Sequence, residues 1–183
     1  SVTQQPIKDA LFRIEPLAPL QGSVIERTTD GNGEIVLQDL PTGSYRITEI
    51  SVPKPYIVNS TPQIVAIDNQ HDDYTVTFPN NAEGILYILK RDAETDEPLA
   101  GAWFSITKAD GTAVADVGPT GPNGYTSLTG LQPGSYVVKE TRAPDGHVID
   151  GESKTFEVKA EDSGKVYVLI FDNHSKPEMW LRK

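Results

Sequence analysis

Apolar residues in this chain fall in short runs that alternate with polar residues. In the second half of the chain, the runs lie at 85–91, 102–108, 124–128, 134–141, 153–159 and 165–172, and Gly, Pro, Asn or Asp occupies the breaks. Alternation with a period of two is typical of a β-strand with one buried face, and no long stretch repeats at helical spacing. Six or seven short strands in about 90 residues favour a β-sandwich, so the predicted fold class is all-β.

An internal repeat predicts two domains. Residues 28–53 align without a gap with 119–144 at an offset of 91, and the two segments share an Asn-Gly pair, Gly-Ser-Tyr and Glu at matching places. The similarity extends outward in both directions, from PIKDALFRI to PLAGAWFSI and from YTVTFPN to YVLIFDN. A tandem repeat of this length predicts two sandwich domains, at 1–81 and 84–175.

The last apolar run belongs to the same repeat. Residues 179–183 (MWLRK) match 86–90 (LYILK) at an offset of 93. We therefore predict that 178–183 form the first strand of a following repeat. In the same register, the corresponding lysine of the first domain would precede Ser1, so this domain is expected to lack its first strand.

Composition and charge limit the partners. The chain has 16 Lys and Arg against 26 Asp and Glu, with a formal net charge of −10. Nucleic-acid binding depends mainly on clustered basic residues, so a nucleic-acid partner is not expected. No apolar stretch is long enough to span a bilayer, so this segment is not expected to insert into a membrane. Cysteine is absent, which excludes disulfides and thiolate chemistry.

Three motifs of the second domain carry a resemblance to a known family. They read LYILKRDAETDEPLAGAWFSI, then NGYTSLTGLQPGSYVVKETRAPDGHVI, then VYVLIFDN. In this order they resemble the Cna B-type domain, also called the SpaA-like or prealbumin-like domain, of Gram-positive surface adhesins and pilins. The first domain is similar more loosely, through TEISVPKPY. The resemblance implies two tandem Ig-like or prealbumin-like β-sandwich domains.

The resemblance also implies a covalent bond that the domain makes by itself. In this family a lysine on the first strand and an asparagine on the last strand form an isopeptide bond, and a glutamate on a central strand promotes it. Carried over to this sequence, the cross-linked residues are Lys90 and Asn173, and the catalytic residue is Glu140. No cofactor is implied. Apart from this single turnover, we expect no enzyme activity.

The alternation of side chains supports this chemistry independently. Lys90 shares its strand face with Leu86 and Ile88, and Glu140 shares its face with Val138, so both charges are expected to point into a core. Burial lowers the pKa of a lysine and raises that of a carboxylic acid. A neutral amine is a nucleophile, and a protonated glutamate can donate a hydrogen bond to the asparagine carbonyl. A buried Lys–Glu ion pair beside a polar strand end is the alternative.

The repeat bears on two competing residues. Asp172 could replace Asn173 as the acceptor, but its counterpart in the first domain is a proline. Lys139 could replace Lys90 as the nucleophile, but its counterpart is a threonine. The three residues that the resemblance selects do recur, as Glu49, Asn80 and Lys183.

This recurrence raises the possibility of a bond between molecules. If 178–183 of one molecule fill the vacant edge of the first domain of another, Lys183 would approach Glu49 and Asn80. An intermolecular isopeptide between Lys183 and Asn80 could then form, with Glu49 as the catalytic residue, and the molecules would associate head to tail. The alternative is that 178–183 are a frayed tail.

Metal ligands are not evident. The three histidines, His71, His147 and His174, fall at unrelated repeat positions. The DGNG turn with nearby Glu34 could be taken for part of a calcium loop, but the matching turn of the second domain has lost the acidic residue. No metal site is therefore expected.

The sequence predicts a structural role. The expected function is that of a stalk segment in an extracellular, cell-wall-anchored adhesin or pilus-like protein of a Gram-positive bacterium. The expected partners are neighbouring repeats of the same protein, together with an unidentified host ligand of the whole protein. The alternative is a ligand-binding adhesin module for host matrix or glycan, for which Trp103, matched by a leucine in the first domain, is the candidate residue.

Overall fold

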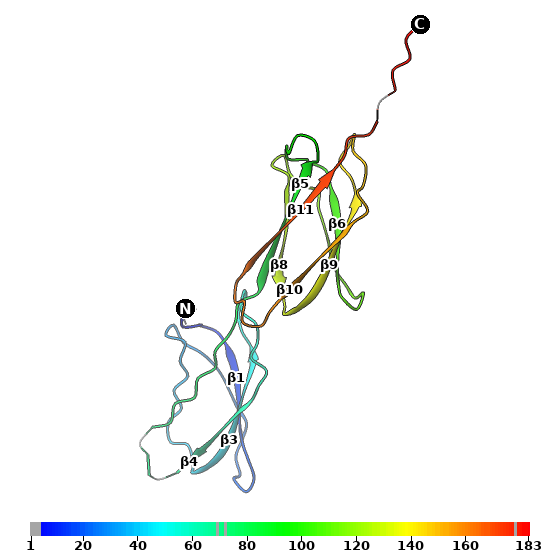
Figure 1. The fold of residues 1–183 in the computed structure, drawn as a ribbon. Coiled ribbons are helices and arrows are strands. Elements are labelled where there is room, and N and C mark those ends of the chain that lie inside the picture. Colours follow the sequence, from blue (N-terminus) through cyan, green and yellow to red (C-terminus); the bar gives the residue numbers. More distant parts are fainter. Residues whose placement is uncertain (1–4, 69, 72, 178) are drawn as a thin grey trace. The chain divides into compact units, whose positions relative to one another are not determined.

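A computed structural model gives the fold of the chain (Figure 1). It describes residues 5–68, 70–71, 73–177 and 179–183. These residues form eleven β-strands and no helix, which confirms the all-β prediction. The chain divides into two compact units, Ser1–Ala82 and Glu83–Lys183.

The second unit is a sandwich of two sheets. One sheet has the strand order β10-β9-β6-β7 and the other has the order β11-β5-β8. Each of the six predicted runs contains a strand, and β7 is an additional one. The strands are β5 (Gly84–Asp92), β6 (Trp103–Lys108), β7 (Ala113–Val117), β8 (Tyr125–Leu131), β9 (Gly134–Arg142), β10 (Ser153–Val158) and β11 (Val166–Asn173).

The first and last strands of this unit lie side by side. β5 is the middle strand of its sheet, antiparallel to β8 and parallel to β11. In the parallel pair, Lys90 lies opposite Phe171, and Asn173 lies opposite Asp92. This register brings Lys90 and Asn173, which are 83 residues apart in sequence, to the same end of two adjacent strands.

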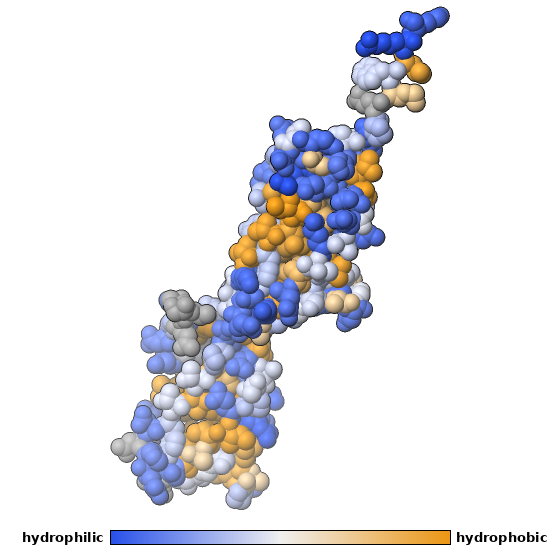
Figure 2. All heavy atoms as spheres, in the orientation of Figure 1, coloured by the Kyte–Doolittle hydropathy of each residue, from blue (hydrophilic) through white to orange (hydrophobic). Residues whose placement is uncertain are grey.

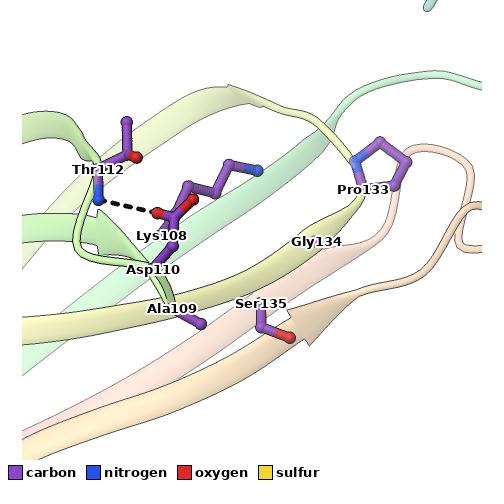
Figure 3. A pocket seen from close by; sticks show the side chains of 7 residues that line it. All are labelled: Lys108, Ala109, Asp110, Thr112, Pro133, Gly134 and Ser135. Atoms are coloured by element: carbon purple, nitrogen blue, oxygen red, sulfur yellow. Dashed lines mark hydrogen bonds between the residues drawn. The ribbon is translucent and has the colours of Figure 1, made fainter.

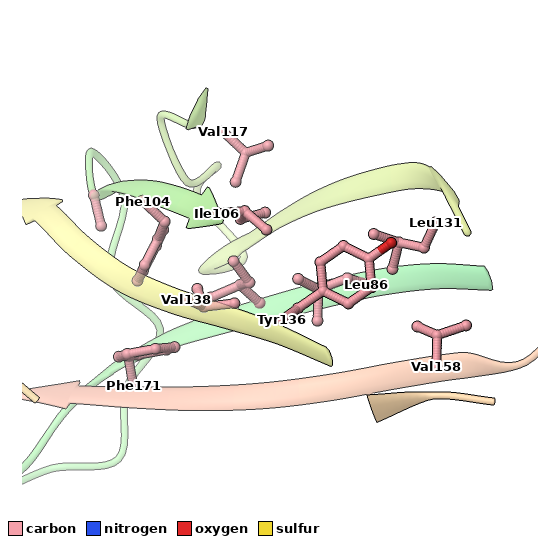
Figure 4. Packing of buried hydrophobic residues seen from close by; sticks show 11 residues of the cluster. Leu86, Phe104, Ile106, Val117, Leu131, Tyr136, Val138, Val158 and Phe171 are labelled. Carbon is pink, nitrogen blue, oxygen red and sulfur yellow. The ribbon is translucent and has the colours of Figure 1, made fainter. Parts of the chain in front are cut away.

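The core of the second unit lies between its two sheets. Figure 4 shows Phe104, Ile106, Tyr136 and Val138 of one sheet facing side chains of the other sheet. Burial of a large apolar side chain contributes roughly 1.5–3 kcal/mol, so this cluster supplies much of the stability of the unit. Apolar side chains also lie on the outer face of this unit, over β11 and β5 (Figure 2).

The first unit contains one four-stranded sheet, with the order β2-β1-β3-β4. Its strands correspond through the repeat to β7, β6, β9 and β10. A smaller apolar core, centred on Phe12, Ile14 and Tyr45, covers one face of the sheet. The strands are β1 (Leu11–Pro16), β2 (Ile25–Thr28), β3 (Gly43–Ser51) and β4 (Gln63–Ile67).

A second sheet is not formed by the described residues of the first unit. Residues 34–38 and 74–80, which match β8 and β11, alternate in burial as strands do, yet neither segment pairs in a sheet. In the second unit both counterparts bond to β5. Among the described residues of the first unit, no strand is assigned to that middle position.

The predicted strand at 178–183 falls partly outside the described residues, because Glu178 is not described. Residues 179–183 lie in no strand, and Met179, Trp180 and Leu181 are 83%, 78% and 91% exposed. The assignment of this segment to a following repeat stays a prediction. The predicted domain 1–81 likewise begins with four residues, 1–4, that lie outside the described part of the chain.

Candidate isopeptide site

The second unit brings the three predicted residues into contact. Lys90 comes from β5, Asn173 ends β11, and Glu140 comes from β9 of the opposite sheet. The Nζ atom of Lys90 donates a hydrogen bond of 2.6 Å to Oδ1 of Asn173. The Nδ2 atom of Asn173 donates one of 2.9 Å to Oε1 of Glu140, which lies 3.6 Å from Lys90 Nζ. The three side chains therefore form a closed polar group inside the sandwich.

This group is sealed from solvent. Lys90 and Asn173 are both 0% exposed and Glu140 is 3% exposed. Phe171 is the register partner of Lys90, and Phe104 is the partner of Glu140. The two phenylalanine rings contact each other with centroids 5.0 Å apart. Aromatic side chains from both sheets thus flank the polar group and keep it in an apolar environment.

Burial shifts the proton affinities of both charged partners. It lowers the pKa of Lys90 from its ordinary value, because desolvation outweighs the attraction of Glu140. It raises the pKa of Glu140, because desolvation outweighs the effects of Lys90 and of the Asn173 hydrogen bond. Both shifts favour the neutral pair, an amine and a carboxylic acid. That pair holds the same number of protons as the ion pair.

The orientation of the amide differs from the expectation. Sequence reasoning placed the acid of Glu140 on the carbonyl oxygen of Asn173. In the structure the oxygen faces Lys90, and the NH₂ group donates to Glu140. Rotation of the amide about its last side-chain bond exchanges these positions, and alternation along a strand carries no information about that rotation. As found, the nitrogen that would leave in a bond-forming reaction already contacts the acid.

The competing residues lie elsewhere. Asp172 points away from the site and forms an ion pair with Arg91, in which Nε and Oδ1 are 2.9 Å apart. Lys139 is exposed on β9, next to the buried Glu140. Alternation along β9 and β11 therefore assigns Glu140 and Asn173 to the core and their sequence neighbours to the surface.

The first unit contains part of the same group. Glu49 is buried on β3, and its Oε2 atom accepts a hydrogen bond of 2.7 Å from Nδ2 of Asn80. The backbone carbonyl of Ile57 accepts a second bond, of 2.9 Å, from the same nitrogen. The other carboxylate oxygen of Glu49, Oε1, is buried and has no hydrogen-bond partner among the described residues. The predicted Lys183 lies in the exposed tail.

Sequence reasoning missed a second buried cluster, at the end of β5. Asp92 accepts hydrogen bonds from the backbone N–H groups of Glu94 and Thr95, each 2.9 Å long. Its Oδ2 atom lies 2.9 Å from Nε2 of His147. The His147 hydrogen bond, followed by the two amides, holds the pKa of Asp92 well below its usual range. This cluster holds in place the chain that follows Lys90. Asp92 and His147 are 55 residues apart, so no local sequence pattern indicates their contact.

The other predicted candidates lie in ordinary structural surroundings. Asp30 of the DGNG turn accepts hydrogen bonds from the backbone N–H groups of Asn32 and Glu34, as an Asx turn does. His71 bonds to Asp68, and His174 bonds to Glu94. The described residues contain no group of three or more His, Cys, Asp or Glu side chains placed to hold a metal ion. Nor do they contain a helix that could cross a membrane.

Two open hollows lie on the surface of the second unit. One is lined by Trp103, Asp116, Thr141 and Arg142. The other lies beside the turn between β6 and β7, where Figure 3 shows Lys108 next to the Thr112–Asp110 hydrogen bond of 2.9 Å. The amine of Lys108 also donates to the hydroxyl of Tyr136. Ligand binding at Trp103 stays a prediction, because the hollow beside it carries no further feature that selects a ligand.

Comparison with known proteins decides the family. The family model of SpaA, described as a prealbumin-like fold domain, matches residues 1–82 and again 84–173. The chain belongs to this family. Both units are therefore SpaA prealbumin-like domains, which confirms the resemblance seen in the sequence.

The SpaA-domain chain is similar to a collagen adhesin and to a second bacterial protein. It is 31% identical over 94 residues to a collagen adhesin of Staphylococcus aureus, a match that covers 48% of the chain and 8% of the adhesin. Its fold is similar to that of the Bacillus anthracis TIE protein, with a TM-score of 0.51, 27% identity, and coverage of 95% of this chain and 32% of the other. The chain thus spans a small part of both relatives.

A pilin shows the same fold. The shaft pilin SpaA of Lactobacillus rhamnosus GG is similar over 96% of this chain and 90% of its own, with a TM-score of 0.51 and 18% identity. At this identity the likeness concerns the fold alone.

Proposed function

We propose that this chain is a structural stalk segment of a Gram-positive surface adhesin or pilus-like protein, and that a Lys90–Asn173 isopeptide bond stabilises its second unit. Membership of the SpaA family and the likeness to a collagen adhesin support the structural role and an extracellular, cell-wall-attached location. The observation that carries the bond is the 2.6 Å contact between Lys90 Nζ and Asn173 Oδ1 in a fully buried site beside Glu140.

The reaction needs only the three side chains. The neutral amine of Lys90 attacks Cγ of Asn173, and a new Nζ–Cγ bond forms. Glu140 gives its proton to Nδ2 and takes one from Nζ, so the Cγ–Nδ2 bond breaks and ammonia leaves. An amine and a primary amide thereby become a secondary amide and ammonia, and Glu140 ends in the state in which it began. The contact of Nδ2 with Glu140 Oε1 suits this proton transfer.

The bond would tie the first strand to the last. It closes a loop between residues that are 83 positions apart in sequence. Treated as a disulfide of that loop length, it stabilises the folded unit by about 4–5 kcal/mol through the unfolded state. Unlike a disulfide, an amide is not reduced. This property suits a cysteine-free protein that bears load outside the cell.

Intact mass spectrometry tests the proposal. We expect the purified chain to be lighter than its sequence mass by one ammonia, and Glu140→Ala to have the full mass and a lower melting temperature. Glu157→Ala is the matched control, because Glu157 is exposed on β10 and should leave the mass deficit unchanged. A wild-type mass equal to the sequence mass contradicts the bond.

A further inference from the structure

The three side chains of the proposed reaction lie where their strands end. Lys90 is two residues from the end of β5, Glu140 is two residues from the end of β9, and Asn173 is the last residue of β11. Strand ends open more readily than strand centres. A displacement of about 1 Å between reacting groups can slow a reaction roughly a hundredfold. The proposed reaction therefore depends on what holds these strand ends together.

The loop after β9 is tied by its backbone to the chain after β11. Residues 146–148 of the loop lie beside residues 174–176, with an isolated antiparallel bridge between His147 and Ser175. Two backbone hydrogen bonds, 2.8 and 3.0 Å long, flank this bridge. The end of β11 is thus fixed to the segment that continues from β9.

The side chain of His147 adds β5 to this pair of segments. From the bridge its ring reaches Asp92, the last residue of β5, with Nε2 2.9 Å from Oδ2. Asp92 lies opposite Asn173 in the parallel pair, and the N–H of Ala93 donates a hydrogen bond of 3.0 Å to the carbonyl of Asn173. The side chains of His147 and Asp92 are only 14% and 11% exposed, so little water competes for their bond. One side-chain contact thus joins β5, β9 and β11 beside the reactive group.

The repeat separates the backbone bridge from the histidine. In the first unit, Tyr56 and Ala82 form an isolated bridge of the same kind. They correspond to His147 and Ser175 at offsets of 91 and 93. The bridge therefore forms with other side chains, and it does not require the imidazole. What the histidine provides in the second unit is the additional bond to Asp92.

We propose that His147 and Asp92 are positioning residues for the isopeptide reaction. Their bond holds the ends of β5, β9 and β11 in the register that keeps Nζ of Lys90 against the amide of Asn173. This inference rests on the proposed function and leaves its chemistry unchanged, since the bond acts through the main chain and not through proton transfer. Loss of the bond should therefore lower the rate at which folded chains react, by about tenfold to a hundredfold.

The rate of ammonia loss tests this role. The whole chain, prepared unreacted and unfolded by chemical synthesis, is diluted into native buffer, and its mass is followed while tryptophan fluorescence reports folding. Among molecules that have folded, His147→Ala should lose ammonia at least about tenfold more slowly than the wild type. His147→Gln keeps an N–H donor at a similar reach and should recover most of the rate. An unchanged rate in His147→Ala overturns the positioning role.

His174→Ala is the matched control. His174 also contacts a carboxylate at this end of the unit, with Nδ1 2.6 Å from Oε1 of Glu94. This pair is exposed and joins the chain after β11 to the chain after β5, without the loop after β9. The variant should react at the wild-type rate. Equal slowing in His174→Ala and His147→Ala would contradict a specific role of His147.

A second control separates position from stability. Leu131 is buried at the opposite end of β5, where it lies beside Gly84 in the register. Leu131→Val should lower the melting temperature of the second unit, because it removes part of a buried apolar side chain. Its folded chains should nevertheless react at the wild-type rate. If Leu131→Val slows ammonia loss as much as His147→Ala does, the reaction follows stability alone and the proposal is wrong.

Hydrogen exchange reports the register directly. Chains that carry Glu140→Ala should not react, so the effect of the histidine can be measured without a cross-link. Adding His147→Ala to them should speed exchange of the Ala93 amide, which bonds to the carbonyl of Asn173. Unchanged exchange at this amide would show that the His147–Asp92 bond does not hold the register.

The positioning role and the isopeptide bond fail in different ways. If the wild type and His147→Ala lose ammonia equally fast, the positioning role is overturned and the Lys90–Asn173 bond stands. If wild-type chains fold and never lose ammonia, the bond is contradicted and the positioning role fails with it.

Discussion

Among the described residues, Lys90 has an amine that is both buried and adjacent to an amide carbonyl. Lys90 cannot be solvated where it lies, and its two polar neighbours are Asn173 and Glu140. An isolated buried charge is costly, and the apolar flank of Phe104 and Phe171 shifts the balance towards the neutral pair. The environment that penalises the lysine as an ion thus prepares it as a nucleophile.

The first prediction concerns pH. Bond formation should be fastest where the Lys90–Glu140 pair holds one proton, and slower on both sides. Below the lowered pKa of Lys90 the amine is protonated, so the pair holds two protons and Lys90 is no longer a nucleophile. Above the raised pKa of Glu140 no acid remains to protonate the leaving nitrogen. The limit on the acid side should lie below the ordinary lysine value of 10.5, and the limit on the alkaline side should lie above the ordinary glutamate value of 4.5.

The measurement starts from unreacted chain, prepared unfolded by chemical synthesis and diluted into buffers of different pH. Loss of ammonia is followed by intact mass, and tryptophan fluorescence confirms that the chain folds at each pH. A rate that rises steadily with pH, with no decline on the alkaline side, would exclude Glu140 as the acid.

At the scale of elements, the position of β5 depends on the turn before β8. The N–H of Lys90 donates to the carbonyl of Gly124, with a length of 2.8 Å. Gly124 has a φ of +76°, and a Cβ atom added there would lie 2.6 Å from the carbonyl oxygen of Lys90. The turn and the strand are thus in contact at the residue that must react.

The second prediction follows from this close approach. Gly124→Ala should destabilise the second unit by about 2–4 kcal/mol, because strain at positive φ adds to overpacking against β5. It should also lower the fraction of cross-linked chain. Gly111→Ala is the matched control, since Gly111 has a φ of +88° but nothing within 4 Å of the added Cβ, so only about 1 kcal/mol is expected. Urea unfolding and intact mass measure both effects. Equal losses in the two variants would show that the contact with Lys90 has no influence.

Elements also show what the sequence could and could not reveal. Alternation and the repeat predicted the strands of the second unit other than β7 and the burial of Lys90 and Glu140, because each depends on neighbours along one strand. The amide rotation of Asn173 and the contact of Asp92 with His147 depend on packing between distant segments. The lack of sheet pairing for 34–38 and 74–80 among the described residues depends on the middle strand, and the register of the repeat indicated it where local alternation could not.

At the scale of the whole molecule, a force applied to the two ends of the second unit would enter through β5 and leave through β11, which lie parallel and adjacent. Backbone hydrogen bonds between these strands would share the load without the isopeptide. With it, the force passes directly from Lys90 to Asn173, and the sequence between them is not extended.

The third prediction concerns the length of chain that is released when the second unit unfolds under force. In single-molecule pulling, Glu140→Ala should show an unfolding event of the second unit that includes the 83 residue steps from Lys90 to Asn173, worth roughly 290 Å of extended chain. The wild type should lack this length at all forces below covalent rupture. Glu157→Ala should behave as the wild type. Release of the full length from wild-type chains would contradict a covalent tie.

The burial of Lys90 and Asn173 affects whether the proposed reaction can be reversed. If the proposed bond forms, its ammonia is lost to bulk water, and the new amide lies where Lys90 and Asn173 are both fully buried. Such a step would run in one direction and only in chains that have folded. Each cross-linked molecule would keep a permanent mark of that event, still readable by its mass after denaturation. In a mixed sample, the fraction of light molecules would count every chain that had ever reached the native state.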